Sequence, residues 1–147
     1  MFSYSKLAQS GIAAVSYLAG ISGESRLAGS GEIAAARKLS PQLTAKILTL
    51  MSRAGIVRGT PGPTGGYRLA RPAAEISLFD VIRVFEDPEL RVMCPFGPTW
   101  CGTGPQCPLH DTLLDLHCQT IERLQQESFA QFETPPESRI DECETVR

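Results

Sequence analysis

Three cysteines and one histidine stand close together in the second half of the chain, in the stretch CPFGPTWCGTGPQCPLH. They are Cys94, Cys101, Cys107 and His110, and their spacing is Cys-x6-Cys-x5-Cys-x2-His. Structural zinc sites usually take thiolates in pairs about two to four residues apart, and this stretch contains no such pair. The wider spacing favours an iron–sulfur cluster, because a cluster is a larger object that the loop can surround. A zinc site and three thiols without a metal remain as alternatives.

The sequence predicts a single domain without a membrane segment. It has 147 residues and contains no run of about 18 apolar residues that would span a bilayer. Near the N-terminus the apolar residues recur at helical spacing, which favours an amphipathic helix over about residues 4–20 rather than a signal peptide. We therefore expect a cytoplasmic protein, and in that compartment clustered cysteines hold a metal more often than a disulfide.

Charge is divided unevenly along the chain. Residues 1–72 carry nine Lys or Arg and two acids, whereas residues 73–147 carry five Arg and fourteen acids. The first part therefore predicts a basic surface that binds a polyanion such as nucleic acid. Outside the cysteine-rich stretch we find no paired carboxylates, no nucleophile beside a base and no phosphate-binding loop, so we do not expect an enzyme.

The basic part predicts two short helices. The first, GEIAAARK, is expected to take Ser30 as its N-cap residue. The second runs over residues 41–54, with Ser40 as N-cap, Pro41 in the first turn and Gly55 in a left-handed conformation after its end. Two short helices joined by a tight turn are typical of a helix-turn-helix.

A β-hairpin is expected directly after the second helix. Residues 56–59 and 67–70 read as two short strands around a Pro- and Gly-rich turn. A hairpin in this position is typical of the wing of a winged-helix domain, and Arg58, Arg68 and Arg71 are placed to meet phosphates.

Two further helices follow the hairpin. Ser77 is the expected N-cap residue of a short helix. A long helix is expected over residues 109–132, and its apolar seam favours packing against a partner helix. The expected organisation is a DNA-binding domain over 1–87, a cysteine-rich loop over 88–108, a dimerisation helix over 109–132 and a disordered acidic tail over 133–147.

The order of these parts resembles the Rrf2 family of winged-helix transcription regulators, of the IscR/NsrR iron–sulfur type. The resemblance covers about residues 1–132 and is carried by AGIV…GPTGGYRLAR, by EISLFDVIRVFED and by the three spaced cysteines. It implies a mainly α fold with a small β wing, in which a winged helix-turn-helix domain precedes a long C-terminal dimerisation helix. It also implies a homodimer that binds palindromic promoter DNA.

By this resemblance, the helix over 41–54 would enter the major groove and the hairpin turn would enter the minor groove. The expected DNA contacts are Ser40, Gln42, Lys46, Arg58, Thr60 and Arg68. Thr44, Ala45 and Pro61 stand where many family members have other residues, so the base preference cannot be transferred from a relative.

The resemblance also implies an iron–sulfur cluster on the cysteine-rich loop. A [2Fe–2S] cluster held by Cys94, Cys101, Cys107 and His110 is favoured, and a [4Fe–4S] cluster on the three cysteines with a ligand from elsewhere is the alternative. The predicted function is a transcriptional regulator whose cluster senses redox state, iron–sulfur status or nitric oxide. The alternatives are an iron–sulfur carrier or electron-transfer protein without DNA binding, and a cluster-free regulator that uses thiols or zinc.

Overall fold

The computed structural model describes residues 4–88 and 105–134 of the chain. Helices dominate this part, and its two strands form one antiparallel hairpin, so the mainly α prediction is confirmed. The elements in chain order are α1 (Lys6–Gly20), α2 (Ser30–Arg37), α3 (Pro41–Arg53), β1 (Val57–Thr60), β2 (Gly66–Leu69), the 3-10 helix η1 (Ala73–Glu75), α4 (Leu78–Ile82), α5 (His110–Gln126) and the 3-10 helix η2 (Phe129–Phe132).

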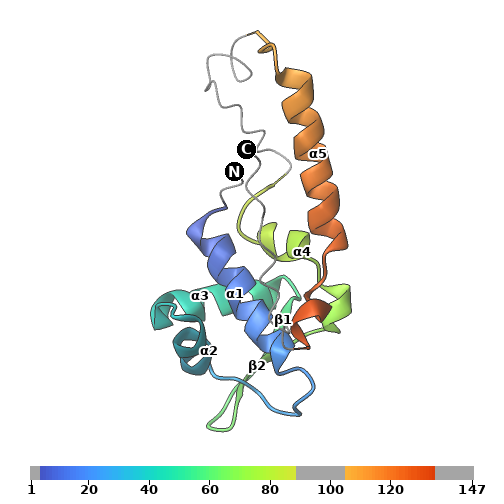
Figure 1. Ribbon diagram of the computed structural model, residues 1–147. Helices are drawn as coiled ribbons and strands as arrows, with labels where there is room; N and C mark the ends of the chain where they lie inside the picture. The colour runs from blue at the N-terminus through green and yellow to red at the C-terminus, as the bar shows by residue number, and fades with distance from the viewer. Residues whose placement is uncertain (1–3, 89–104, 135–147) are drawn as a thin grey trace.

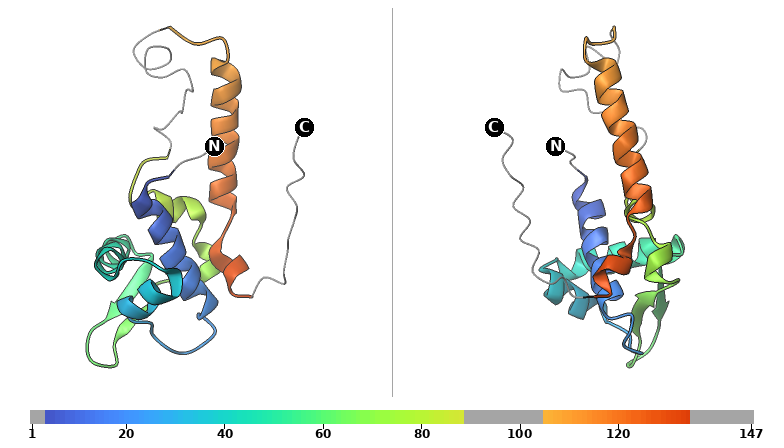
Figure 2. Two further views of the ribbon diagram at one scale, coloured as in Figure 1. Left: turned by 60° about the vertical axis from the view of Figure 1, so that its left-hand side comes forward. Right: turned by 45° about the vertical axis from the view of Figure 1, so that its right-hand side comes forward.

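Helix α1 lies at the centre of a compact head, and α5 projects away from it (Figure 1). Ser5 is the N-cap residue of α1, and its hydroxyl accepts a hydrogen bond from the amide of Ala8 at 3.2 Å. Val15 and Leu18 of α1 are buried and pack with α2, α3, β1 and η2 in one hydrophobic core. Figure 2 shows α2, α3 and the hairpin at the opposite end of the molecule from the start of α5.

Helix α3 confirms the start and stop that the sequence predicts. Ser40 is its N-cap residue and Pro41 lies in its first turn, although no side-chain cap bond is formed by Ser40. Gly55 has a φ of 75°, the left-handed conformation that glycine adopts at low cost. The prediction for α2 is wrong at its first residue, because Gly29 is the N-cap and Ser30 is already helical.

The ends of both strands differ by one residue from the prediction: β1 begins and ends one residue later than expected, and β2 one residue earlier. Its pairing sets Val57 opposite Leu69 and Arg58 opposite Arg68, and the amide of Ala70 extends the pairing by donating to the carbonyl of Ile56 at 3.0 Å. Successive residues of a strand face opposite sides, so the arginine pair faces away from the core that Val57 enters.

A third backbone segment holds the hairpin against the head. Ala28, in the connection between α1 and α2, pairs with Tyr67 through two backbone hydrogen bonds of 2.8 and 3.0 Å. The wing is therefore attached along β2 as well as through the chain that leads into β1.

Ser77 caps α4 as predicted, and it does so through a capping box. The amide of Asp80 donates to the Ser77 hydroxyl at 3.1 Å, and the Ser77 amide donates to the Asp80 carboxylate at 3.1 Å. Two orphan amides at the start of the helix are satisfied in this way. Phe79, Val81 and Ile82 of α4 are buried.

The long C-terminal helix is shorter than the sequence predicts. α5 ends at Gln126, and Glu127 is extended with a ψ of 111°. After it, η2 turns back onto α1, and Phe129 is fully buried in the core of the head. The expectation of a continuous helix over 109–132 is therefore wrong in its last turns. The remaining expected boundaries fall on or beside residues outside the described ranges and stay predictions.

Candidate nucleic-acid interface and metal ligands

The wing presents two arginines side by side. Arg58 and Arg68 are directly opposite each other in the hairpin register, and both are exposed. Like charges directly opposite on a sheet repel each other, so the binding of an anion between or beside the two arginines would reduce their repulsion. Neither arginine forms an ion pair within the part of the chain that the structure describes. Thr60, at the end of β1, is exposed as well and lies opposite Gly66.

Helix α3 presents the other predicted contacts. Ser40, Gln42 and Lys46 are exposed, and Gln42 and Lys46 are four residues apart, on one face of the helix. Thr44 and Ile47 lie on the buried side of the same helix. The Thr44 hydroxyl donates to the carbonyl of Ser40 at 2.9 Å, so this polar residue is accommodated in the core without an unsatisfied group.

The chain segment that carries these residues has charges of one sign. From residue 33 to residue 74 the chain contains no Asp or Glu, and it contains seven basic residues: Arg37, Lys38, Lys46, Arg53, Arg58, Arg68 and Arg71. The six residues predicted to contact DNA all lie inside this acid-free segment and are all exposed. The structure thus places them on the surfaces of two neighbouring elements, α3 and the wing.

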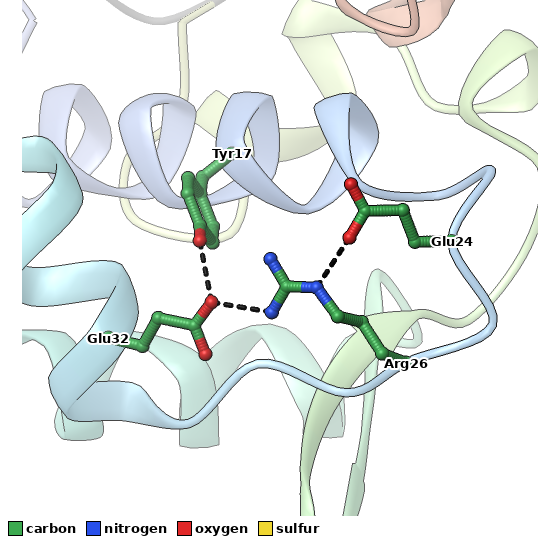
Figure 3. A network of polar contacts seen from close by, with 4 residues as sticks. All are labelled: Tyr17, Glu24, Arg26 and Glu32. Atoms are coloured by element: carbon green, nitrogen blue, oxygen red, sulfur yellow. Dashed lines mark hydrogen bonds and ion pairs between the residues drawn. The ribbon is translucent and has the colours of Figure 1, made fainter.

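A third arginine, Arg26, lies near the wing and is paired with two acids. Arg26 donates to Glu24 at 2.5 Å and to Glu32 at 2.6 Å, and the hydroxyl of Tyr17 donates to the same Glu32 oxygen at 2.6 Å (Figure 3). The bond from Tyr17, followed by that from Arg26, lowers the pKa of the Glu32 carboxyl. The same carboxylates raise the pKa of Arg26. This network ties α1 to α2 and to the connection between them, and it leaves Arg26 less suited to a phosphate than Arg58 or Arg68.

Two of the four predicted metal ligands lie in the described part of the chain. Cys107 is buried and His110 is half-buried at the first turn of α5, and the amide of His110 donates to the carbonyl of Cys107 at 3.0 Å. One turn therefore holds a thiol and an imidazole close in sequence at the start of a helix, a donor set that suits an iron–sulfur cluster or zinc.

Cys94 and Cys101 lie outside the described residues. Within residues 4–88 and 105–134 there is no group of three or more His, Cys, Asp or Glu that could hold a metal ion. The ligand set of four therefore stays a prediction.

The side chains of helix α5 are exposed or half-buried along its whole length. It buries none of its 17 residues, and Leu109, Leu114 and Leu116 are exposed at its start and middle. Its half-buried residues, which include Leu113, Ile121 and Leu124, follow one stripe, and the helix contacts α4. None of the described helices is long and apolar enough to cross a membrane.

Two residues, Asp80 and Phe129, link separate elements in the structure and are not singled out by the sequence. Asp80 combines the α4 capping box with an ion pair to Arg71 at 3.2 Å. Phe129 anchors the C-terminal segment in the head. The capping-box spacing from Ser77 to Asp80 was visible in the sequence, whereas the partner of Phe129 was not, because its contacts are long-range.

Three helices followed by a two-stranded hairpin, with an exposed basic face on the third helix and the hairpin, define a winged-helix protein of the DNA-binding class. The sequence profile of the Rrf2 family, described as an iron-dependent transcriptional regulator, matches residues 4–134. The chain belongs to the Rrf2 family, which consists of transcriptional regulators rather than enzymes.

Two relatives show how far the likeness extends in sequence. The chain is 42% identical over 83 residues to protein aau3 of Rhizobium meliloti (strain 1021), which covers 56% of this chain and 54% of that protein. It is 32% identical over 90 residues to a protein of Aquifex aeolicus (strain VF5) named as an HTH-type transcriptional regulator, covering 60% and 62%. The chain thus spans between half and two thirds of the length of these relatives.

Solved structures confirm the winged-helix fold. CymR (YrzC), the global cysteine regulator of B. subtilis, superposes with a TM-score of 0.73 at 22% identity over 90% of this chain and 97% of that chain. IscR of T. potens superposes with a TM-score of 0.68 at 24% identity over 88% and 84%. At these identities the likeness establishes the fold and leaves the sensed signal open.

Proposed function

We propose that the protein is a DNA-binding transcriptional regulator that reads promoter DNA with α3 and the wing. The observation that carries this proposal is the arginine pair Arg58 and Arg68, which is exposed, uncompensated in the described part of the chain and continuous with the acid-free segment. Phosphates are the anions that such a pair meets beside a recognition helix. Membership of the Rrf2 family supports the same function.

In this arrangement α3 supplies the base contacts and the wing supplies the phosphate contacts. Gln42 is suited to the adenine edge in the major groove, and Lys46 lies one turn further along the same face. Ser40, at the start of α3, presents its hydroxyl there because that hydroxyl makes no cap bond. Arg58, Thr60 and Arg68 then contact the backbone or the minor groove from the hairpin.

We also propose a homodimer, and the exposure of α5 supports it. At about 1.5 Å per residue, its 17 residues span about 25 Å, and leucines are exposed on it. A second copy of α5 would cover these side chains, since an amphipathic helix of this length gains most of its stability from a packed partner. Two heads joined in this way would bind two half-sites of palindromic promoter DNA about one helical turn apart.

The cysteine-rich segment supplies the sensing site of the proposed regulator. An iron–sulfur cluster, with [2Fe–2S] favoured over [4Fe–4S], would be held by Cys94, Cys101, Cys107 and His110. The buried thiol of Cys107 and the half-buried His110 at the start of α5 support this ligand set. When bound, such a cluster supplies redox and ligand-exchange chemistry that responds to oxidation, iron supply or nitric oxide. It regulates DNA binding when its states favour different positions of α5.

The DNA proposal is tested by charge reversal at the interface. Lys46→Glu and Arg58→Glu are compared with Arg83→Glu, which makes the same change in net charge at an exposed residue of the α4 segment. A duplex selected with the wild-type protein is titrated at several salt concentrations. We expect the interface variants to lose about tenfold or more in affinity and to flatten the salt dependence by about one phosphate contact each. Equal losses in all three variants, or no duplex selected by the wild type, would contradict it and favour a carrier.

The cluster proposal is tested by spectroscopy on protein purified without oxygen. Iron and sulfide are quantified per chain, and absorption and EPR spectra distinguish [2Fe–2S] from [4Fe–4S]. His110→Ala should change the spectrum or release the cluster, whereas the matched His117→Ala, two turns further along α5, should leave it unchanged. One zinc per chain with no iron, or a colourless protein with oxidised thiols, would show a cluster-free regulator instead.

A further inference from the structure

The segment that follows α5 pairs with the chain at the start of α4, at Ser77. Ser77 and Ser128 form an isolated antiparallel bridge, in which the amide of Leu78 donates to the carbonyl of Glu127 at 2.9 Å and the amide of Phe129 donates to the carbonyl of Ile76 at 3.0 Å. This bridge follows the last turn of α5 directly. The buried ring of Phe129 holds the bridge in place from the core side.

Asp80 joins the same point to the wing. One of its carboxylate oxygens accepts the amide of Ser77 at 3.1 Å and the guanidinium of Arg71 at 3.2 Å. Arg71 lies two residues after the end of β2 and three residues after Arg68, which faces the proposed DNA surface. A continuous set of bonds therefore runs from the end of α5 through Ser77 and Asp80 to the base of the wing.

The ion pair is poorly placed to serve stability alone. The side chains of Arg71 and Asp80 are 40% and 33% exposed, and ion pairs with this exposure contribute little to the free energy of unfolding. Its geometry is nevertheless defined at both ends, because the capping box fixes the carboxylate and the strand pairing of Ala70 with Ile56 fixes the backbone next to Arg71. This ion pair therefore fixes the position of Arg71 relative to Asp80.

We propose that Asp80 is a positioning residue, which holds the wing arginines in a fixed relation to the C-terminal end of α5 through Arg71 on one side and the Ser77–Ser128 bridge on the other. The proposal rests on the proposed function in one respect, namely that the wing contacts DNA. Movement of α5 reaches the wing through this joint. Loss of the joint lets the base of the wing shift, although the Ala28–Tyr67 pairing still holds the hairpin, and weakens DNA binding without unfolding the head.

Asp80→Asn tests the joint because it removes the charge and keeps the cap. The side-chain oxygen of asparagine can still accept the amide of Ser77, so α4 retains its start. The matched control is Glu75→Gln, which removes one negative charge from an exposed residue of η1. Removal of a negative charge near DNA strengthens phosphate binding in general, so the control should bind DNA as tightly as the wild type or more tightly.

The proposal predicts the opposite sign for Asp80→Asn. We expect its affinity for the selected duplex to fall about twofold to fivefold, the range that an ion pair of this exposure can contribute, while its melting temperature stays close to that of the wild type. Affinity that rises in parallel with Glu75→Gln would overturn the proposal, because Asp80 would then act only through its charge.

A second measurement needs no DNA and keeps the two proposals apart. Residue-resolved amide hydrogen exchange is measured in Arg71→Gln and in the control Arg68→Gln, which removes a neighbouring arginine whose side chain forms no ion pair within the described residues. We expect Arg71→Gln, and not Arg68→Gln, to speed exchange at the bridge amides of Leu78 and Phe129. Unchanged exchange at those amides would overturn the link to α5. If the exchange result holds and no DNA is bound, the joint stands and the DNA function fails.

Discussion

The burial of Phe129 makes a quantitative prediction about the C-terminal segment. Phe129 is 0% exposed and belongs to the same core as α1 and α3, although it lies more than a hundred residues further along the chain than Leu18. Truncation of a fully buried phenylalanine to alanine costs about 3–5 kcal/mol in transfer energy and cavity formation. Domains of this size are stable by about 5–15 kcal/mol. Phe129→Ala should therefore remove about a fifth or more of the stability of the head.

The matched control for this change is Phe132→Ala. Phe132 lies in the same 3-10 helix, is 42% exposed and has its ring centroid 5.6 Å from that of Phe129. Its loss removes one aromatic contact and little buried area, for which we expect about 1 kcal/mol. Urea denaturation followed by far-ultraviolet circular dichroism measures both variants. If Phe129→Ala is destabilised by less than about 1 kcal/mol, or no more than Phe132→Ala, η2 does not belong to the core and the reasoning fails.

Two further predictions concern the wing and the network of Tyr17. Gly65→Ala should disorder the hairpin turn and abolish DNA binding with little change in helix content, because an added Cβ would lie 2.1 Å from the carbonyl oxygen of Thr60. Amide NMR spectra of the wing and a duplex titration test this prediction. Unchanged spectra of the wing amides would contradict it. The carboxyl of Glu32 has a lowered pKa in the folded protein, so its contribution is complete above the ordinary value of 4.5 and is lost as pH falls through the folded value. The stability difference between wild type and Glu32→Gln should therefore shrink below about pH 4.5, and a difference independent of pH would refute the role of the network.

The DNA-binding head could be predicted from local signals in the sequence. Ser40, Pro41 and Gly55 mark the ends of α3 by rules that depend on neighbouring residues alone, and the structure agrees with them to within a residue. The same holds for Ser77 at the start of α4. Ser30 was misplaced because Gly29 next to it is an equally permissive cap residue, and a choice between adjacent positions depends on how α2 packs.

The end of α5 could not be predicted in this way. Apolar residues continue at helical spacing through Phe129 and Phe132, so the pattern favours one unbroken helix. The helix stops at Gln126 because the backbone of Glu127 and Phe129 is taken up by hydrogen bonds to residues 76 and 78. Those bonds form between segments about fifty residues apart, and periodicity carries no information about them.

The candidate interface and the candidate ligands differ in how far the structure tests them. All six predicted DNA contacts are described, and all are exposed on α3 or the wing. Of the four predicted ligands, Cys107 and His110 are described and lie in one turn, whereas Cys94 and Cys101 lie outside the described residues. The spacing of the cysteines nevertheless favours a cluster on chemical grounds, because ligands that must surround several metal ions need wider separation than a zinc knuckle provides.

The position of the candidate ligands limits how they can influence DNA. Cys107 and His110 lie at the start of α5, at the opposite end of the molecule from α3 and the hairpin (Figure 1). Helix α5 packs against α4 and buries none of its own residues, and the Ser77–Ser128 bridge with Phe129 behind it attaches its C-terminal end to the head. A change of state at the ligands can alter DNA affinity only if it shifts α5 differently in the two states. Such a shift reaches the base of the wing through the bonds at Ser77 and Asp80, and this path makes Asp80→Asn the variant that tests whether α5 and the wing are coupled.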